Sequence, residues 1–198
     1  GVLEVRLHAE GRHARKLWIE APGSGFTPTR ITHELIDQRR HFPRMEGRFV
    51  FKHAVTRMPE VLLESLGAAS LKLEDVDLFL FHQANLRINE YVAQQLAIPP
   101  EKCPSNIERY GNCSAASIPM LLDEAVRGGR LARGSLVAMT TFGSGFSWST
   151  ALARYYRRPR TDRARVMPHR VEARPPALEP VPAAAARMPL SRADSGTS

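Results

Sequence analysis

The 198-residue chain carries a net charge of +8, with 43% hydrophobic and 24% charged residues, which is a composition that can fold around a core. Two cysteines exclude a disulfide scaffold and a four-cysteine zinc site. No apolar run approaches the roughly 18 residues that a membrane span needs. The first residues lack the basic and apolar pattern of a secretory signal, so we expect a cytoplasmic protein with no membrane partner.

Residues 157–198 differ in composition from the rest of the chain. They hold nine arginines against four acidic residues and seven of the 15 prolines, so most of the net charge lies there. Isolated aliphatic residues among Pro and Arg cannot bury enough apolar surface to offset the entropy of ordering. We therefore expect a folded part over 1–156 and a disordered tail over 157–198. A nucleic-acid role for the tail is an alternative that no recognised module or aromatic interleaving supports.

Residues 1–156 alternate between strand and helix patterns. Alternation predicts strands over 2–8 and 16–20, which we expect to pair as a hairpin. Mostly loop follows, with a short helix over 32–38. The patterns beyond it predict helices over 46–66, 85–96 and 117–126, and strands over 77–81, 135–142 and 146–155.

Two details refine this prediction. Pro59 lies inside the first long helical pattern, where we expect a kink. The run over 77–81 is apolar throughout, which is typical of a strand buried on both faces in a parallel sheet. Strands and helices in this alternation indicate an α/β fold with a layered sheet.

Three segments carry groups that suit chemistry. His82 directly follows the buried strand, and the carboxyl end of such a strand is where α/β sheets place their sites. Asn112 lies in a turn of small residues that opens a helix, where the backbone can approach a ligand closely. Residues 143–145 join two strands and can present a backbone N–H to an oxyanion. Taken singly, each has a structural alternative: a histidine at a strand end, a helix N-cap and a tight turn.

Together these segments resemble the β-ketoacyl-acyl-carrier-protein synthase III family. Their order matches, and so do the spacings from Phe51 to His82 and from His82 to Asn112. The resemblance covers residues 1–156. It rests on four segments, MEGRFVFK (45–52), HQANLR (82–87), GNCSAAS (111–117) and FGSGFSW (142–148).

The resemblance implies the C-terminal half of a thiolase-like fold, in which two similar halves stack as α-β-α-β-α layers, usually in a homodimer. It implies an acyltransferase of fatty-acid or related lipid biosynthesis. In that reaction a cysteine takes an acyl group from acyl-CoA, malonyl-acyl carrier protein loses CO₂, and the resulting enolate attacks the acyl-cysteine. The resemblance implies acyl-CoA and malonyl-acyl carrier protein as substrates, and neither a metal nor another cofactor.

The same resemblance assigns roles to individual residues. His82 and Asn112 match the catalytic pair, whose N–H groups can stabilise the oxygen charge that decarboxylation builds up. Ser144 matches the backbone donor for the other oxyanion. Arg87 and Lys52 match basic residues that steer the acidic carrier protein, although each also suits an ordinary solvated helix face. The residues that match the substrate channel are Gly47, Phe51, Asn85 and Phe142.

The sequence departs from the family in two respects. Arg48 stands where the family often has an amide that contacts the pantetheine arm. The family's nucleophilic cysteine has no counterpart in the segment before His82, and neither Cys103 nor Cys113 matches it. Because the chain also begins at Gly1 without a Met, we expect a fragment or a natural half that cannot form the acyl-enzyme alone.

Such a chain would work with a Cys-bearing N-terminal half. A close variant uses a longer acyl group, or a second acyl-CoA in place of the carrier protein. The alternative from another class is a non-catalytic partner or regulatory subunit that completes another condensing enzyme.

Overall fold

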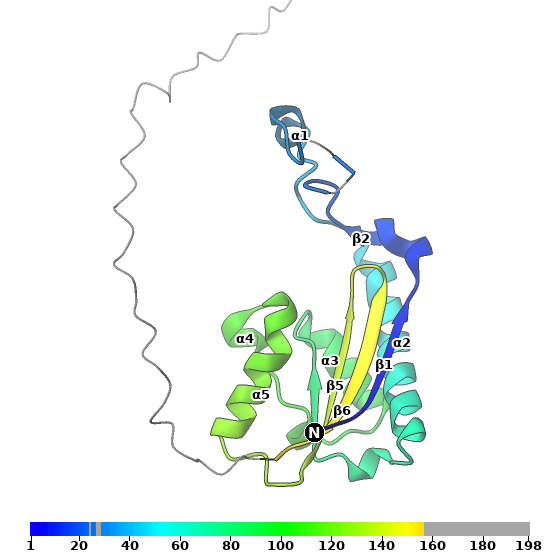
Figure 1. Ribbon diagram of the computed structural model, residues 1–198, viewed down its shortest axis with the longest axis vertical. Coiled ribbons are helices and arrows are strands. Elements are labelled where there is room, and N and C mark those ends of the chain that lie inside the picture. The colour runs from blue at the N-terminus through cyan, green and yellow to red at the C-terminus, as the bar shows by residue number, and fades with distance from the viewer. Residues whose placement is uncertain (24, 27–28, 157–198) are drawn as a thin grey trace, which may run out of the picture. The chain divides into compact units, whose positions relative to one another are not determined.

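The computed structural model describes residues 1–23, 25–26 and 29–156 (Figure 1). The expected tail, 157–198, lies outside the described residues. The described part is a mixed α/β fold built on a four-stranded sheet with the strand order β1-β6-β5-β4. This agrees with the fold class that the sequence predicts.

Three of the strands are antiparallel neighbours and the fourth is parallel. β1 (Val2–Ala9) pairs with β6 (Ser147–Arg154), and β6 pairs with β5 (Leu136–Gly143) through a tight hairpin. β4 (Leu78–Phe81) pairs in parallel with β5, with Leu78 opposite Val137. All four residues of β4 are buried, as the continuous apolar run predicts.

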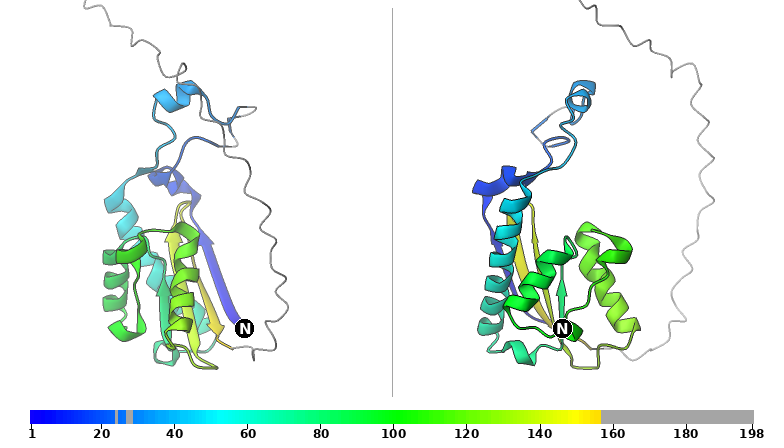
Figure 2. Two further views of the ribbon diagram at one scale, coloured as in Figure 1. Left: turned by 90° about the vertical axis from the view of Figure 1, so that its left-hand side faces the viewer. Right: turned by 180° about the vertical axis from the view of Figure 1, so that it is seen from behind.

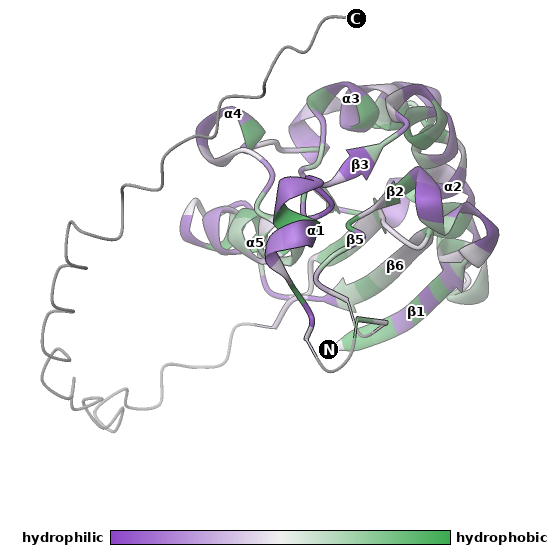
Figure 3. Cartoon of the chain, turned by 90° about the horizontal axis from the view of Figure 1, so that it is seen from above, coloured by the Kyte–Doolittle hydropathy of each residue, from purple (hydrophilic) through white to green (hydrophobic). Residues whose placement is uncertain are grey.

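Helices cover the sheet in two layers (Figures 2 and 3). Side chains alternate along a strand, so Phe79 and Phe81 belong to the core beneath α2 (Gly47–Ala68) and α3 (Leu86–Gln95). Leu78 and Leu80 belong to a second core beneath α5 (Ser117–Arg127), which includes Leu121. One strand thus separates two apolar cores.

The predicted helices form close to their expected bounds. α2 continues through Pro59, which is buried and lies inside the helix without ending it. α1 (His33–Asp37) begins after Thr32, whose hydroxyl accepts a hydrogen bond from the Leu35 N–H at 3.3 Å. The short helix α4 (Ile107–Tyr110) has no counterpart in the sequence prediction.

The predicted pairing of 2–8 with 16–20 is wrong. Residues Gly11–Lys16 form a 3₁₀ turn, and β2 (Leu17–Trp18) pairs instead with β3 (Arg44–Met45). The reason lies at the end of β1, where Glu10 exchanges backbone hydrogen bonds of 2.8 and 3.1 Å with Phe146. β6 therefore pairs with one edge of β1 along its whole length and leaves β1 as an edge strand of the sheet, and the alternation of a strand does not identify its partner.

The two faces of β1 differ in how far the rest of the protein buries them. Glu4, Arg6 and His8 are partly buried, and His8 Nε2 lies 2.6 Å from the Glu64 carboxylate on α2. Leu3, Val5 and Leu7 alternate with them and are exposed by 46%, 56% and 71%. The outer part of the sheet thus shows apolar side chains on the face opposite α2.

No helix within the described residues is long and apolar enough to cross a membrane. The same residues contain no group of three or more His, Cys, Asp or Glu side chains that could hold a metal ion.

One buried polar pair tests the register of β5 against β6. Thr140 on β5 and Thr150 on β6 are opposite each other and fully buried, with their hydroxyl oxygens 2.9 Å apart. Thr140→Val leaves the other hydroxyl buried without its partner, so we expect a loss of about 1–3 kcal/mol in unfolding free energy. The double variant with Thr150→Val removes both groups and should recover most of that loss. Urea unfolding of the wild type, the two single variants and the double variant measures these losses. Losses of the single variants that simply add in the double variant would contradict the pairing.

Candidate active site

The segments singled out from the sequence meet at one end of the sheet (Figures 1 and 2). β4 runs toward this end and leads into His82. The β5–β6 turn, the first turn of α2 and the first turn of α5 lie at the same end. The sheet therefore brings four separate parts of the chain to one end of the fold.

Hydrogen bonds at both the backbone and the ring hold His82 in place. Its N–H donates to the Thr140 carbonyl at 2.9 Å, which continues the parallel pairing of β4 with β5. Its ring nitrogen Nδ1 lies 2.6 Å from the hydroxyl of Ser117, the first residue of α5. Burial of the imidazole lowers the pKa of His82 below its ordinary value, so the ring is neutral at neutral pH.

Asn112 lies on the loop between α4 and α5. Gly111 before it has a φ of +66°, a backbone conformation that glycine adopts without strain. The Asn112 side-chain oxygen accepts a hydrogen bond from the Ser114 N–H at 2.9 Å. Because the oxygen is used in this way, the exposed NH₂ end is left to donate. Asn112 is not the N-cap of α5, a position that Ala116 occupies.

Gln83 is a buried polar residue that the sequence analysis did not single out. Its side-chain NH₂ donates to the Phe81 carbonyl at 2.8 Å. Its side-chain oxygen accepts from the Ser105 hydroxyl at 2.9 Å and from the Asn106 N–H at 3.2 Å. Gln83 thus ties the end of β4 to the segment that leads into α4.

Glu124 on α5 holds the same segment from the other side. Its carboxylate accepts hydrogen bonds from Asn106 Nδ2 at 3.0 Å and Arg109 Nη2 at 2.9 Å. The Asn106 hydrogen bond, with further ones from Tyr110 and Arg109, lowers the pKa of Glu124 below its ordinary value. These contacts position α4, whose end leads directly into Asn112.

The β5–β6 turn is anchored on the segment that follows β1. The Ser144 hydroxyl donates to the Leu17 carbonyl at 2.7 Å, so its side chain is held by the backbone of β2. Gly145 has a φ of +140°, and a Cβ placed there would lie 2.5 Å from the Ser147 hydroxyl, so a larger residue does not fit. Phe142 is buried and packs on Phe146, with the ring centroids 5.0 Å apart.

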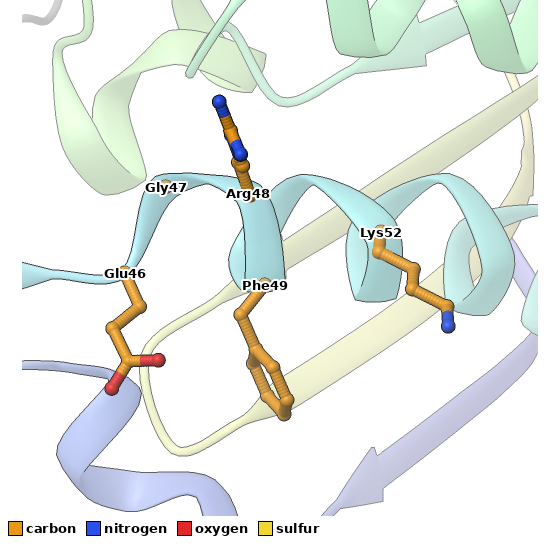
Figure 4. Close-up of a pocket in the computed structure, with 5 residues that line it drawn as sticks. All are labelled: Glu46, Gly47, Arg48, Phe49 and Lys52. Carbon is orange, nitrogen blue, oxygen red and sulfur yellow. The ribbon is translucent and has the colours of Figure 1, made fainter.

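An open pocket of about 520 Å³ lies at the first turns of α2 (Figure 4). Arg48 points to the opposite side of the helix from Phe49 and Lys52. Gly47, which was expected in the substrate channel, and Lys52, which was expected to steer the carrier protein, both line this pocket. Its full lining is Glu46, Gly47, Arg48, Phe49 and Lys52.

Of the other residues expected at the channel or its mouth, Phe142 lies on β5, and the rest lie on α2 and at the start of α3. Phe51 packs edge-on against Tyr91 of α3, with the ring centroids 6.0 Å apart. Asn85 caps α3, because its side-chain oxygen accepts from the Arg87 N–H at 3.0 Å. The Arg87 side chain, in the first turn of the same helix, is exposed.

The two cysteines occupy different environments. Burial raises the pKa of the Cys103 thiol to about 12, which keeps it protonated and unreactive. The Cys113 thiol, next to Asn112, donates to the Tyr110 carbonyl at 3.3 Å.

Sequence comparison relates this chain to a known family. Residues 66–155 match the family described as 3-oxoacyl-[acyl-carrier-protein] synthase III C terminal. The β-ketoacyl-[acyl-carrier-protein] synthase III of Rhizorhabdus wittichii is 41% identical over 155 residues, which are 78% of this chain and 45% of the relative. The protein of the same name from a Bradyrhizobium species is 42% identical, over 78% of this chain and 44% of the relative.

Solved structures agree with the sequence comparison. The 3-oxoacyl-[acyl-carrier-protein] synthase III of Aquifex aeolicus superposes with a TM-score of 0.67 at 40% identity, over 78% of this chain and 44% of that one. The Thermus thermophilus synthase III gives a TM-score of 0.68 at 38% identity, over 78% and 46%. The chain thus spans a little under half the length of the relatives it matches.

Glu124 supplies a pH-dependent test of the site's support. Its folded-state pKa is lowered, so its stabilising contribution is present above the ordinary pKa of a glutamate and is lost as the pH falls through the folded value. We expect Glu124→Gln to lower the urea midpoint at about pH 7, and the difference from the parent to shrink between about pH 5 and about pH 3. Glu108→Gln, a change on α4 beside the same arginine, is the matched control. A difference that is constant with pH, or equal in the control, would contradict this role.

Proposed function

The chain corresponds to the C-terminal part of the β-ketoacyl-acyl-carrier-protein synthase III family, and we propose that it supplies the His/Asn part of a decarboxylating condensing site. The reaction joins an acyl group from acyl-CoA to malonyl-acyl carrier protein with loss of CO₂. The observation that carries the proposal is the linkage of His82 and Asn112. Ser117 contacts His82 Nδ1 and the Ser114 carbonyl, and the Ser114 N–H holds Asn112.

The chemistry needs donors directed at one oxygen. Loss of CO₂ from the malonyl thioester leaves an enolate with negative charge on the thioester oxygen. Two preorganised N–H donors, the His82 imidazole and the Asn112 amide, stabilise that charge without a metal or another cofactor. The burial that keeps His82 neutral agrees with this role, because a neutral imidazole that carries its proton on Nε2 donates from that nitrogen.

The β5–β6 turn serves the second oxyanion in this proposal. When the enolate carbon attacks the acyl-cysteine, charge develops on the acyl oxygen, and the Ser144 backbone N–H donates to it. The bond from the Ser144 hydroxyl to Leu17 supports this role because it fixes the turn. Buried Phe142 keeps water from the reacting groups.

The nucleophilic cysteine comes from a Cys-bearing N-terminal half. The raised pKa of Cys103 supports this part of the proposal, since a buried protonated thiol is a poor nucleophile. The exposed leucines and valine of β1 provide an apolar face for that half to cover. The complete enzyme is proposed to be a homodimer.

The carrier protein docks at the first turns of α2 and α3. Lys52 lines the pocket on α2, and Arg87 is exposed in the first turn of α3. The contact between Phe51 and Tyr91 holds the two helices together, so the helix positions that carry Lys52 and Arg87 are fixed relative to each other. Positive charge here attracts an acidic carrier protein and accelerates its association.

Paired with the Cys-bearing half of the Rhizorhabdus wittichii relative, the chain should catalyse condensation. Replacing either His82 or Asn112 by Ala should slow the release of CO₂ from malonyl-acyl carrier protein by about 10²–10³-fold, the usual cost of one oxyanion donor. Formation of the acyl-cysteine from acyl-CoA should change far less. Labelled CO₂ release and intact-protein mass report the two steps separately.

The control for this experiment is His33→Ala, on the separate helix α1. The unpaired chain incubated with acyl-CoA should keep its original mass. Wild-type CO₂ release by both site variants would overturn the proposed roles, and acylation of the unpaired chain would show that no second half is needed. Binding to another synthase without any turnover would favour the regulatory-subunit alternative.

The docking role predicts a salt-dependent loss of binding. Lys52→Glu or Arg87→Glu should weaken the binding of acyl carrier protein by about tenfold at low ionic strength, and by less at high salt. Arg127→Glu, on α5, is the matched charge reversal and should have little effect. Calorimetric titration at two salt concentrations measures this, and an equal loss in all three variants would indicate a response to net charge alone.

A further inference from the structure

The Ser117 hydroxyl lies at the centre of the site's hydrogen bonds. Ser117 is buried, with 2% of its surface exposed. Its oxygen lies 2.6 Å from His82 Nδ1 and 3.0 Å from the Ser114 carbonyl oxygen, and it accepts from the Gln83 N–H at 3.3 Å. Two acceptors therefore compete for the one proton of the hydroxyl.

The choice between these acceptors sets the position of the imidazole proton. If the hydroxyl donates to Nδ1, a neutral His82 carries its proton on Nε2 and can donate toward the substrate. If the hydroxyl donates to the Ser114 carbonyl, Nδ1–H donates to Ser117 and a neutral ring has only a lone pair on Nε2. An imidazolium, with both nitrogens protonated, also requires this second arrangement.

Two observations favour the first arrangement for the neutral ring. The hydroxyl oxygen lies closer to Nδ1, at 2.6 Å, than to the Ser114 carbonyl oxygen, at 3.0 Å. The Ser114 carbonyl also accepts the Ser117 backbone N–H, so it stays hydrogen-bonded when the hydroxyl turns away. The Gln83 N–H keeps its acceptor in either arrangement.

We propose that Ser117 is a positioning residue that holds the neutral His82 in the Nε2–H form by donating to Nδ1, and that turns its hydroxyl to the Ser114 carbonyl when the ring is charged. The inference rests on the proposed role of His82 as a donor. No proton is gained or lost by the serine, because its hydroxyl only rotates between two acceptors.

The same hydroxyl links the two proposed donors. Ser114, whose carbonyl is the second acceptor, holds the Asn112 oxygen through its own N–H. The Ser117 hydroxyl thus lies between the ring of His82 and the turn that orients the Asn112 amide. Around His82, α3 contributes the Asn89 amide at 3.3 Å from the His82 carbonyl, β5 the Thr140 backbone and α5 Ser117, all of them uncharged.

Nitrogen NMR of the full chain tests the proposal directly. The chain is labelled with ¹⁵N-histidine, and the His82 signals are assigned by their loss in His82→Gln. At high pH, we expect Nε2 of the wild type to show the protonated type of resonance and Nδ1 the unprotonated type. A predominant Nδ1–H form in the wild type would overturn the proposal whatever the variants do.

Two substitutions distinguish the effect of the Ser117 hydroxyl on His82 from an effect on folding. Ser117→Ala removes the acceptor for Nδ1–H of the imidazolium and the donor to neutral Nδ1. We expect a mixture of both tautomers and a His82 pKa about one pH unit lower. Ser117→Thr keeps the hydroxyl and should restore the wild-type tautomer and pKa.

Ser105→Ala is the matched control, because its hydroxyl donates to Gln83 at 2.9 Å in the same network. It should leave the His82 tautomer and pKa unchanged. An unchanged tautomer and pKa in Ser117→Ala, or an equal shift in Ser105→Ala, would overturn the proposal. The readout needs no turnover, so a failure here is distinct from a failure of the proposed function: His82 can carry its proton on Nε2 in a chain that does not condense anything.

Discussion

The burial of β4 on both faces is the constraint on which the other parts of the site depend. A strand of four residues can be fully buried only if helices cover both sides of it, and α2 with α3 and α5 do so. The chain must leave this apolar environment at His82 and Gln83. A polar group that is still partly or fully buried at such a point needs partners, since an unpaired one costs about 1–3 kcal/mol.

The partners come from the segments that pack beside the strand end. Ser117 lies at the start of the helix that covers one face of β4, so its hydroxyl reaches the ring of His82. Gln83 satisfies both ends of its amide, with Phe81 on one side and with Ser105 and Asn106 on the other. The polar contacts that hold the site together are therefore consequences of the apolar packing. These contacts also fix the position of the segment around Ser105 and Asn106.

Much of this fold could be predicted from the sequence because its main signals are local. The apolar run over 77–81 and the helical periodicity of α2 are visible without any partner, and both elements form where expected. The partner of β1 was predicted wrongly because the alternation of a strand carries no information on its neighbour. The true neighbour, β6, lies at the far end of the described residues, as the pairing of Val2 with Ala153 shows.

The site was predicted unevenly for the same reason. His82 and Asn112 could be selected because their surrounding motifs occur in a fixed order and spacing. Ser117 was quoted only as the last residue of a motif, and Glu124 was not singled out at all. Their roles depend on contacts with residues that lie 35 and 18 positions away on other segments, and the periodicity within one helix or strand does not predict contacts between segments. Buried polar networks of this kind are fixed by tertiary packing, which a single sequence does not display.

The contrast between His82 and Asn112 bears on what the proposed second half would provide. The properties of His82 that matter for donation, its neutral charge and the partner on Nδ1, are set by burial beneath α5 and by Ser117. The orientation of Asn112 is set by Ser114, although the side chain itself is exposed. Both proposed donors are thus arranged by contacts within the described residues. In an assembled enzyme, the second half would need to bring the nucleophile and exclude water from the exposed amide, while the direction of both donors would already be fixed by this chain.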